Sequence, residues 1–472
     1  MLQPSDPLSP KVVIVGGGIA GLATAYLVRE LGRERGANPQ ITILESKNMT
    51  GGATRTDHVD GFTCEWGPNG FLDNEPATLD LIERLGLKKR LVKASSHASK
   101  RYIYHHGQMH EVPLSPRQFL SSSILPVKSK LRVAMELAVP AKRDGEDETV
   151  YNFARRRLGD TFAHYMIDPM VSGIFAGNAK ELSLRAVFPK MVEMETDHGG
   201  LFRAMIAKKR EAKRNGKISG GPGGAAATLT TFENGMGELT DTLAAELKEN
   251  IITNCEVKAV LKQGESFEVV TNGQTHSADV VILACPSYAA AEIVSELSFN
   301  AAEGLRAIPF APVDVVAHGH KIEDVGHSLD GFGVLIPRGE DYRALGSLWC
   351  DAIFPGQAPA GTHMLRTMIG GAHDPDIVEL SDRDVESLAA KEHRKLFNVK
   401  RDPVFRKLIR HPKGIAQYTR GHLDRVRETE ILERQLPGLL FTGASYRGVS
   451  VNGCAKDAFR VANLLLDMWR LN

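Results

Sequence analysis

The stretch VVIVGGGIAGLATAYLV, residues 12–28, is the longest nearly uncharged run of the chain, and it suits either a membrane anchor or the start of a fold. A membrane-spanning helix needs about 20 apolar residues without a break in the backbone. Three consecutive glycines, Gly16, Gly17 and Gly18, interrupt this run after only a few apolar positions. We therefore expect no anchor here. The β-branched start predicts a strand over 11–15, and the apolar spacing after the glycines predicts a helix.

The glycines between this strand and helix follow the pattern Gly16-x-Gly18-x-x-Gly21. Gly16 permits a tight turn, Gly18 lets the backbone approach a diphosphate, and Gly21 lets the helix pack closely on the strand. The helix N-terminus then presents free N–H groups to the phosphates. A second strand over 41–45 ends in Glu45, close to the spacing of a carboxylate that binds ribose hydroxyls. These features predict a Rossmann-like dinucleotide-binding unit.

Composition and charge narrow the class of protein. With 472 residues, 42% of them hydrophobic, the chain is long enough for two or three domains with a large core. The 58 Lys and Arg nearly balance the 57 Asp and Glu, so the net charge of +1 gives no global field to attract nucleic acid. The five cysteines are too scattered for a redox pair, a zinc site or a disulfide framework, and we expect no metal site. Residues 1–10 lack the apolar core of a signal peptide, so we expect a cytoplasmic protein.

Two further glycine-containing stretches favour FAD over NAD. Residues 46–56 place Gly51 and Gly52 shortly after the ribose-binding acid, with Arg55 behind them. A second backbone segment and a guanidinium can thus approach the same diphosphate. Residues 439–466 read as a strand, a glycine-punctuated loop and a helix. The N-terminus of that helix suits the edge of a flavin ring, which holds negative charge when it is reduced.

Together these stretches resemble the FAD-binding family that includes monoamine oxidases, phytoene desaturases and protoporphyrinogen oxidases, and the resemblance covers nearly the whole chain. Further segments resemble the protoporphyrinogen oxidase branch, in its order: 65–72, 100–104, 168–184, 231–239, 331–337, 368–372 and 443–454. The chain departs from the usual form at Gly70, where a serine is common. From the motifs and the resemblance, the cofactor-binding candidates are Gly16, Gly18, Ile19, Ala20, Gly21, Glu45, Ser46, Gly52, Ala53, Arg55, Gly67, Pro68, Val257, Ala284, Gly443, Val449 and Val451.

The resemblance implies oxidation of protoporphyrinogen IX to protoporphyrin IX in heme biosynthesis, with coproporphyrinogen III as the alternative substrate. Either reaction removes six electrons, which a two-electron flavin does in three rounds. Because no second nucleotide motif appears, we expect oxygen or a quinone as the electron acceptor. The chemistry needs little acid–base help, so the protein mainly holds the substrate. Asn69 is the candidate catalytic residue, and the candidate substrate-binding residues are Arg101, which would pair with a propionate, Leu335, Leu348, Met368 and Gly173.

Other interpretations of these residues stay open. Arg101 is also compatible with an ordinary surface arginine, and the three apolar candidates are also compatible with plain core positions. An amine or polyene oxidase of the same fold is a competing function, although Ser445 and Tyr446 do not clearly supply the aromatic cage that an amine oxidase uses. A nucleotide-binding scaffold without turnover is a competing class.

The order of the motifs predicts an α/β (α+β multidomain) fold. The Rossmann-like FAD-binding domain is discontinuous, because its motifs lie at both ends of the chain: 1–95, 222–300 and 415–472. Residues 96–215 are mostly helix-patterned, and residues 301–414 carry alternating strand runs that suit a mixed-sheet substrate domain. The glycine-rich segment 218–229 is expected to be a linker.

Basic residues lie beside apolar faces in the helical segment, which favours peripheral association with the cytoplasmic membrane. A solvated basic face is the alternative. The resemblance further implies hand-off of the porphyrin to a chelatase. The basic residues are Lys128, Lys130, Arg132, Lys208, Lys209, Arg210, Lys213 and Arg214.

Overall fold

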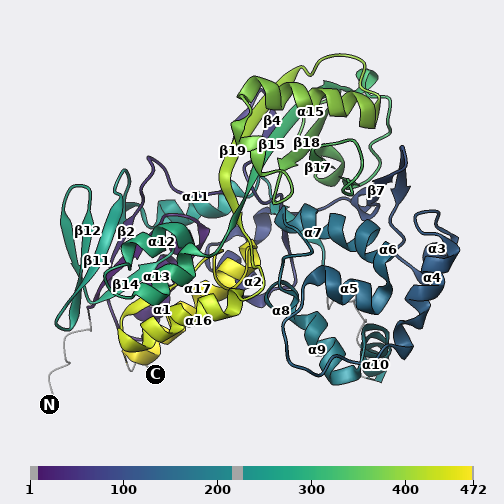
Figure 1. Cartoon of the computed structure of the whole chain (residues 1–472). Coiled ribbons are helices and arrows are strands. Elements are labelled where there is room, and N and C mark those ends of the chain that lie inside the picture. The colour runs from purple at the N-terminus through teal and green to yellow at the C-terminus, as the bar shows by residue number, and fades with distance from the viewer. Residues whose placement is uncertain (1–8, 215–226, 470–472) are drawn as a thin grey trace.

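The computed structural model describes residues 9–214 and 227–469. Most of the expected lead-in and most of the glycine-rich linker therefore lie outside the described residues. Figure 1 shows three parts: a layered part that holds both termini, an upper sheet, and a group of helices at the lower right. The fold is a mixed α/β multidomain fold, as predicted. Within the described residues, no helix is both long and apolar enough to cross a membrane.

The layered part is built on a parallel five-stranded sheet with the order β10-β2-β1-β14-β20. Strand β1 lies near its centre, where Val13 pairs with Thr42 on one side and Val281 on the other. The apolar runs predicted as strands form here because both faces of the sheet are covered. The strands are β1 (Lys11–Val15), β2 (Gln40–Leu44), β10 (Ile251–Ile252), β14 (Val280–Leu283) and β20 (Leu439–Phe441).

Helices cover each face of this sheet with a hydrophobic core. Side chains such as Val12 and Ile14 point into one core, and Val13 and Val15 point into the other. The first core is closed by α1 (Ile19–Glu34), α2 (Pro76–Arg84), α11 (Gly237–Glu246) and α17 (Val451–Met468). The second is closed by α12 (Ser287–Ile293), α13 (Phe299–Arg306), α16 (His422–Gln435) and the antiparallel strands β11 (Val257–Gln263), β12 (Ser266–Thr271) and β13 (Thr275–Ala278).

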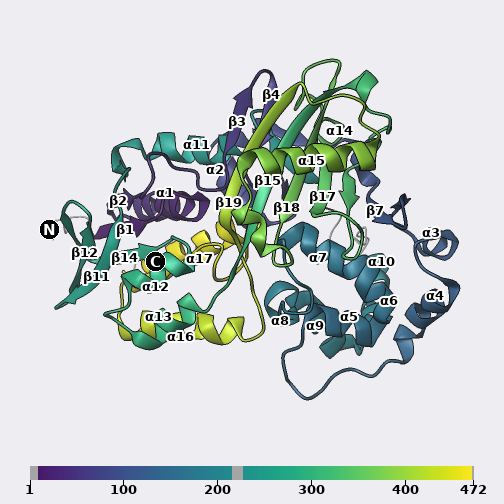
Figure 2. The same cartoon turned by 45° about the horizontal axis from the view of Figure 1, so that its top comes forward.

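The upper sheet has seven strands in the order β19-β15-β18-β17-β16-β7-β8. Helix α15 (Asp382–Phe397) packs across one face of it, as Figures 1 and 2 show. The strands are β7 (Tyr102–His105), β8 (Gln108–Glu111), β15 (Phe310–Lys321), β16 (Gly333–Leu335), β17 (Ala344–Trp349), β18 (Thr362–Gly370) and β19 (Phe405–Ala416).

Three strands of this sheet depart from the predicted boundaries. Strands β7 and β8 fall inside the segment 96–215 that was expected to be mostly helical, because the alternating residues 102–111 form a hairpin at the sheet edge. Its turn uses positive φ at His106 and Gly107. Strand β19 also runs beyond residue 414, where the sheet domain was expected to end.

Short strands link the two sheets. The hairpin of β3 (Thr56–Val59) and β4 (Phe62–Glu65) reaches from the layered part to the upper sheet, where Phe62 stacks on Phe405 with ring centroids 4.4 Å apart. Figure 2 shows this hairpin beside β15 and β19. A small sheet of β5 (Phe71–Leu72), β9 (Leu229–Phe232) and β6 (Leu91–Lys93) follows.

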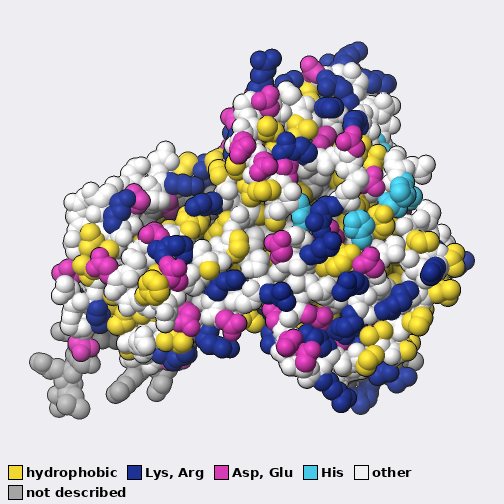
Figure 3. Space-filling view, in the orientation of Figure 1, with side chains coloured by type: hydrophobic (Ala, Val, Ile, Leu, Met, Phe, Trp, Pro, Cys, Tyr) yellow, Lys and Arg dark blue, Asp and Glu magenta, His cyan; other side chains and the backbone are white. Residues whose placement is uncertain are grey.

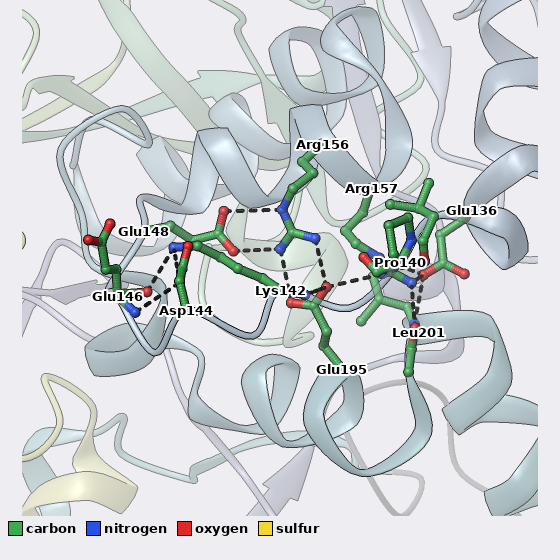
Figure 4. Close-up of polar contacts among 12 residues, drawn as sticks. Glu136, Pro140, Lys142, Asp144, Glu146, Glu148, Arg156, Arg157, Glu195 and Leu201 are labelled. Carbon is green, nitrogen blue, oxygen red and sulfur yellow. Dashed lines mark hydrogen bonds and ion pairs between the residues drawn. The ribbon is translucent and has the colours of Figure 1, made fainter.

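The helical part contains a buried ion cluster, drawn in Figure 4. The Arg157 guanidinium is fully buried, and its Nε donates to Glu136 Oε1 at 2.9 Å while Nη1 donates to Glu195 Oε1 at 3.0 Å. Glu136 also accepts from the backbone N–H of Leu201 at 2.8 Å, so it caps the start of a helix. Because these charges are paired, their burial is tolerated. The helices are α3 (Pro116–Ser121), α4 (Val127–Ala134), α5 (Val150–Leu158), α6 (Asp160–Phe162), α7 (Asp168–Phe175), α8 (Leu184–Val187), α9 (Pro189–His198) and α10 (Leu201–Arg214).

Candidate active site

The first glycine turn lies between β1 and α1, and the structure gives each glycine a distinct environment. Gly16 has φ +111°, which an L side chain rarely adopts. A Cβ on Gly21 would lie 1.9 Å from the Gly16 carbonyl oxygen, so only glycine allows this helix to approach the strand. A Cβ on Gly18 would meet only Gly52 Cα, at 4.0 Å. The space beside Gly18 is therefore open, as a diphosphate requires.

Glu45 lies directly after β2, against the same turn. Its Oε2 accepts a hydrogen bond from the Gly17 N–H at 2.7 Å, and its Oε1 accepts from the Lys47 N–H at 2.8 Å. Ser46 Oγ donates to the same carboxylate at 3.3 Å. The Cys255 N–H donates to the Glu45 carbonyl oxygen at 2.9 Å and thereby brings the start of β11 to this acid. The predicted Val257 is the first residue of that strand.

The second glycine segment lies along the first. The Gly51 N–H donates to the Gly17 carbonyl at 2.8 Å, and Gly52 has φ +59°. Arg55 lies over the Trp66 ring, with its guanidinium carbon 3.9 Å from the ring centroid. Position 67 also has no room for a side chain, because a Cβ added to Gly67 would lie 2.6 Å from the Ala53 carbonyl oxygen. The neighbouring Pro68 continues this close turn.

The C-terminal glycine segment reaches the same place from the other end of the chain. Gly443 follows β20 with φ +112°, and its Cβ would lie 3.5 Å from Ala20 Cβ and 3.7 Å from the Ala284 carbonyl oxygen. Helix α17 begins at Val451, whose backbone N–H is one of the donors that no intrahelical acceptor satisfies. Its side chain is buried in the core, and Val449 packs against helical residues, so neither side chain is free to grip a ligand. We expect contacts from their backbone.

These pieces meet at the carboxyl ends of β1, β2, β14 and β20, where ligands of open α/β sheets bind. Residues Ile19 and Ala20 form the first turn of α1 there. The geometry thus joins four segments that are far apart in the sequence into one nucleotide cradle. We use this name for the glycine turn, Glu45, the second glycine segment and the C-terminal glycine segment.

A buried arginine of the upper sheet binds the turn beside the cradle. Arg366 of β18 donates from Nε to the Glu65 carbonyl at 3.2 Å and from Nη2 to the Gly67 carbonyl at 2.6 Å. Burial lowers the pKa of Arg366. Sequence reasoning missed this residue, although a charged residue within the apolar run HMLRTMIGGA is a usable signal. Arg366 fixes the turn against the sheet.

Asn69 lies in that turn, and its side chain has no partner among the described residues. Both Oδ1 and Nδ2 are buried without a hydrogen bond. Buried amides almost always have partners, and an unpaired one costs about 1–3 kcal/mol. The Asn69 amide lies beside the cradle, so a bound ligand could supply its missing hydrogen-bond partners.

The predicted apolar residues share one face of the upper sheet. Leu335 is opposite Gly346 in the pairing of β16 with β17, while Gly346 is opposite Met368 and Leu348 is opposite Arg366 in the pairing with β18. Leu335, Leu348 and Met368 are each partly exposed, whereas the residues on either side of them are buried. We call this the substrate face, after the residues predicted to bind the substrate. Helix α15 covers the opposite face.

Gly173 of α7 touches this face. A Cβ on Gly173 would lie 2.5 Å from Leu335 Cδ2, so the helix approaches the sheet because this residue is glycine. Two residues that the sequence placed in the substrate site are thus in contact, although one lies on a helix and the other on a strand.

Arg101 lies at the edge of the substrate face. It directly precedes β7, whose Tyr102 packs into the core under α15, so by strand alternation Arg101 lies on the same side as Leu335. Its side chain is exposed, and its guanidinium carbon lies 5.1 Å from the centroid of the Phe332 ring. No carboxylate of the described residues pairs with it. The guanidinium is available to an incoming carboxylate.

The fold and the site define a dinucleotide-binding α/β protein with a second sheet that presents an apolar face. The chain belongs to the family described as flavin containing amine oxidoreductase, whose pattern it matches over residues 19–466. FAD is its cofactor. The open side of Gly18, the acid after β2 and the unpaired amide of Asn69 fit that cofactor.

Named relatives cover nearly the whole chain. Coproporphyrinogen III oxidase of Bacillus subtilis (strain 168) is 31% identical over 455 residues, which are 94% of this chain and 95% of the relative. The chloroplastic protoporphyrinogen oxidase of Oryza sativa subsp. japonica is 28% identical over 485 residues, covering 98% of this chain and 89% of the relative. A crystal structure from Exiguobacterium sp. 255-15, named for protoporphyrinogen oxidase, has a TM-score of 0.82 at 26% identity and covers 97% of this chain and 98% of its own.

Proposed function

We propose that this chain oxidises a porphyrinogen to the porphyrin, with oxygen as the electron acceptor. The observation that carries the proposal is that the apolar substrate face and Arg101 lie on one side of the upper sheet. Arg366 holds that sheet against the turn beside the nucleotide cradle. A flat, apolar macrocycle with carboxylate arms matches an apolar face with a free guanidinium at its edge. The names of the relatives agree with this substrate class.

Bound FAD would supply the two-electron acceptor for each of three rounds. The chain's own contribution is to hold and orient the substrate. Leu335, Leu348 and Met368 would pack against the macrocycle, and Arg101 would bind a propionate. The Asn69 amide would receive its missing hydrogen bonds from the cofactor or the substrate and so fix the distance between them.

An amine oxidase is a poorer fit to the same fold. Tyr446, which follows the C-terminal glycine, is fully buried beside Phe441 in the core behind the sheet. Ser445 is also buried, and its Oγ accepts a hydrogen bond from the Ser287 N–H at 3.0 Å. Neither residue is placed to form an aromatic wall for an amine.

We take protoporphyrinogen IX, which the resemblance implies, as the first candidate substrate, and coproporphyrinogen III, the substrate in the name of the Bacillus relative, as the second. The two substrates differ in the number of carboxylate arms. Turnover of each by the purified flavoprotein, followed by porphyrin fluorescence in air, tests the proposal. A larger kcat/KM for protoporphyrinogen IX supports the first candidate, and the reverse supports the second. Turnover of neither, with a full complement of FAD, contradicts the proposal.

We further propose that the helical part rests on the cytoplasmic membrane. Large apolar side chains are exposed on α3, α4 and the turn after α4, among them Leu120 at 68%, Val127 at 71% and Leu131 at 63%. Figure 3 shows hydrophobic side chains gathered at the right-hand edge, where Figure 1 places α3 and α4. Lys128 is exposed beside them and suits anionic headgroups.

Two basic residues expected at this surface bind backbone carbonyls instead. Lys130 Nζ donates to the carbonyl oxygens of Leu120 and Ser122 at 2.8 and 2.6 Å. Arg132 donates to the carbonyl oxygens of Arg157 and Arg156 at 3.1 and 2.6 Å, so it binds the end of α5 rather than lipid. The Lys213 side chain lies outside the described residues. Hand-off of the product to a chelatase stays a prediction.

Sedimentation with vesicles that contain anionic lipid tests the membrane proposal. Val127→Asp with Leu131→Asp should abolish binding, since both residues are exposed and their loss leaves the core intact. Phe299→Asp is the matched control, because Phe299 is 75% exposed on α13 in the layered part. Equal binding by the double variant and the control variant contradicts the proposed surface.

A further inference from the structure

Three histidines converge under α15, on the side of the upper sheet opposite the substrate face. His318 and His320 are two residues apart on β15, so their side chains point to the same side of the sheet. His393 lies on α15, which covers that side. All three side chains are buried. One ring nitrogen of each lies within 4.8 Å of those of the other two. We call this group the histidine trio.

The trio has almost no hydrogen-bond partners among the described residues. Both ring nitrogens of His318, both of His320 and Nδ1 of His393 are buried and unpaired. A buried polar atom without a partner lowers folding stability by about 1–3 kcal/mol. Five such nitrogens in one place therefore destabilise the fold strongly unless a ligand binds them. The buried ion cluster around Arg157 shows the ordinary arrangement, in which charged atoms meet complementary partners.

The state of the rings suits metal ligation. An imidazole binds a metal through the lone pair of one ring nitrogen, and no hydrogen bond from the described residues occupies any ring nitrogen of His318 or His320. His393 Nε2 lies 2.7 Å from Thr367 Oγ1, whose hydroxyl donates to Ser347 Oγ at 2.9 Å. The Thr367 oxygen therefore accepts from Nε2–H, which leaves Nδ1 of His393 as the free lone pair. Metal-binding histidines are commonly fixed by such a second hydrogen bond.

We propose that the histidine trio binds a zinc ion that ties α15 to the upper sheet. Three imidazole nitrogens are a common zinc ligand set, with a water molecule in the fourth position. Tetrahedral zinc holds nitrogens about 3.4 Å apart, so small side-chain adjustments close the present spacing. The nearby carboxylate of Asp324 would partly balance the positive charge of the zinc ion. The nearby guanidinium groups of Arg394 and Arg406 would repel that charge.

The sequence contains little signal for this site. The pair His318-x-His320 is on one strand, but the third ligand comes from a helix in a different segment, so the expectation of no metal site rested on cysteine spacing alone. A second group, His105, His106 and Glu340, is a weaker candidate. There, Glu340 already accepts from the His106 N–H at 3.2 Å, and the His106 side chain is exposed.

The test measures zinc in the purified, FAD-loaded full chain after growth with added zinc and dialysis against EDTA. About one zinc per flavin is expected, released to a chromogenic chelator only on unfolding because the site is buried. His393→Ala should lower the zinc content more than roughly tenfold. His106→Ala should keep the wild-type content. The wild-type chain without zinc overturns the proposal, and so does zinc that His393→Ala retains.

Cobalt substitution keeps the test decisive if His393→Ala fails to fold. The wild-type chain refolded with Co²⁺ in place of Zn²⁺, with FAD restored, should show the intense visible bands of tetrahedral cobalt above the flavin spectrum. Thr367→Val should shift these bands, since it removes the partner of His393 Nε2 while the three ligands remain. Absence of the bands in the wild-type chain overturns the proposal, as does a spectrum that excess EDTA bleaches without unfolding, which would indicate an adventitious surface ion.

Discussion

The nucleotide cradle and the substrate face are built by different means. In the cradle, backbone approaches backbone, and glycines with positive φ or with no room for a Cβ make the contacts. On the substrate face, side chains from strands far apart in the chain lie beside one another on one side of a sheet. Substitutions in the cradle should therefore abolish folding or FAD binding altogether. Substitutions on the substrate face should instead change substrate binding and turnover by limited factors.

The sharpest test compares two glycines of the same turn. Gly21→Val should prevent folding, because its Cβ would lie 1.9 Å from a backbone oxygen. Gly18→Val should fold, since φ is −77° and, beyond the two neighbouring residues in the chain, no described atom lies closer than 4.0 Å to the added Cβ. It should still lose FAD, because the side chain occupies the space of the diphosphate. Thermal unfolding and flavin absorbance measure both effects. A Gly18→Val protein with full flavin content contradicts the assignment of the cradle.

Asn69→Leu separates function from stability at the junction of the two regions. Because the amide has no partner among the described residues, replacing it with an apolar side chain of similar volume should leave the Tm unchanged or raise it. Turnover should fall roughly 10- to 100-fold if the amide positions the reactants. A lower Tm with unchanged kcat would mean that Asn69 is structural instead.

Arg101→Ala should weaken substrate binding without affecting the flavin. Loss of a charge-assisted contact costs about 1.5–3 kcal/mol, which is roughly a ten- to hundredfold effect. The contact is made in the ground state and in the transition state, so most of the effect should appear in KM rather than in kcat. Arg101→Lys should restore only part, because a point charge does not reproduce the guanidinium fork. Equal kinetics of the wild type and Arg101→Ala on the free acid would exclude the propionate contact.

The last prediction concerns stability alone, without any expected change in catalysis: a pH dependence of folding stability at Glu65, between the two regions. Burial raises the pKa of Glu65 to about 7 from 4.5, although Thr56 and the Met236 N–H bind its carboxyl group. Between pH 4.5 and pH 7, Glu65 is ionised in the unfolded chain but still protonated in the folded chain. The free energy of unfolding should therefore fall as pH rises through this range, by up to about 3 kcal/mol. Above pH 7 the loss is constant. Glu65→Gln should remove this part of the pH dependence, as urea unfolding at pH 5 and pH 8 measures. An unchanged pH dependence in the variant contradicts the shift.

The same contrast explains what the sequence could predict. The Gly16–Gly21 turn, Glu45 and the strand before Gly443 have local signatures, because strand–glycine–helix units are specified by adjacent residues. Leu335, Leu348 and Met368 were identified by resemblance, and their common face appears only once the strand register is known. Arg366 and the histidine trio depend on contacts between distant segments. Strands β7 and β8 were missed for the same reason, since an edge hairpin is recognised by the sheet that it joins.

The central claim is that the cradle and the substrate face bring one flavin and one porphyrinogen together. Mixing the purified, oxidised flavoprotein with protoporphyrinogen IX or coproporphyrinogen III in the absence of oxygen tests it most directly. The flavin absorbance should bleach with at least one of them, and readmission of air should restore it as porphyrin fluorescence appears. A flavin that stays oxidised with both porphyrinogens, yet bleaches with an amine, would contradict the account.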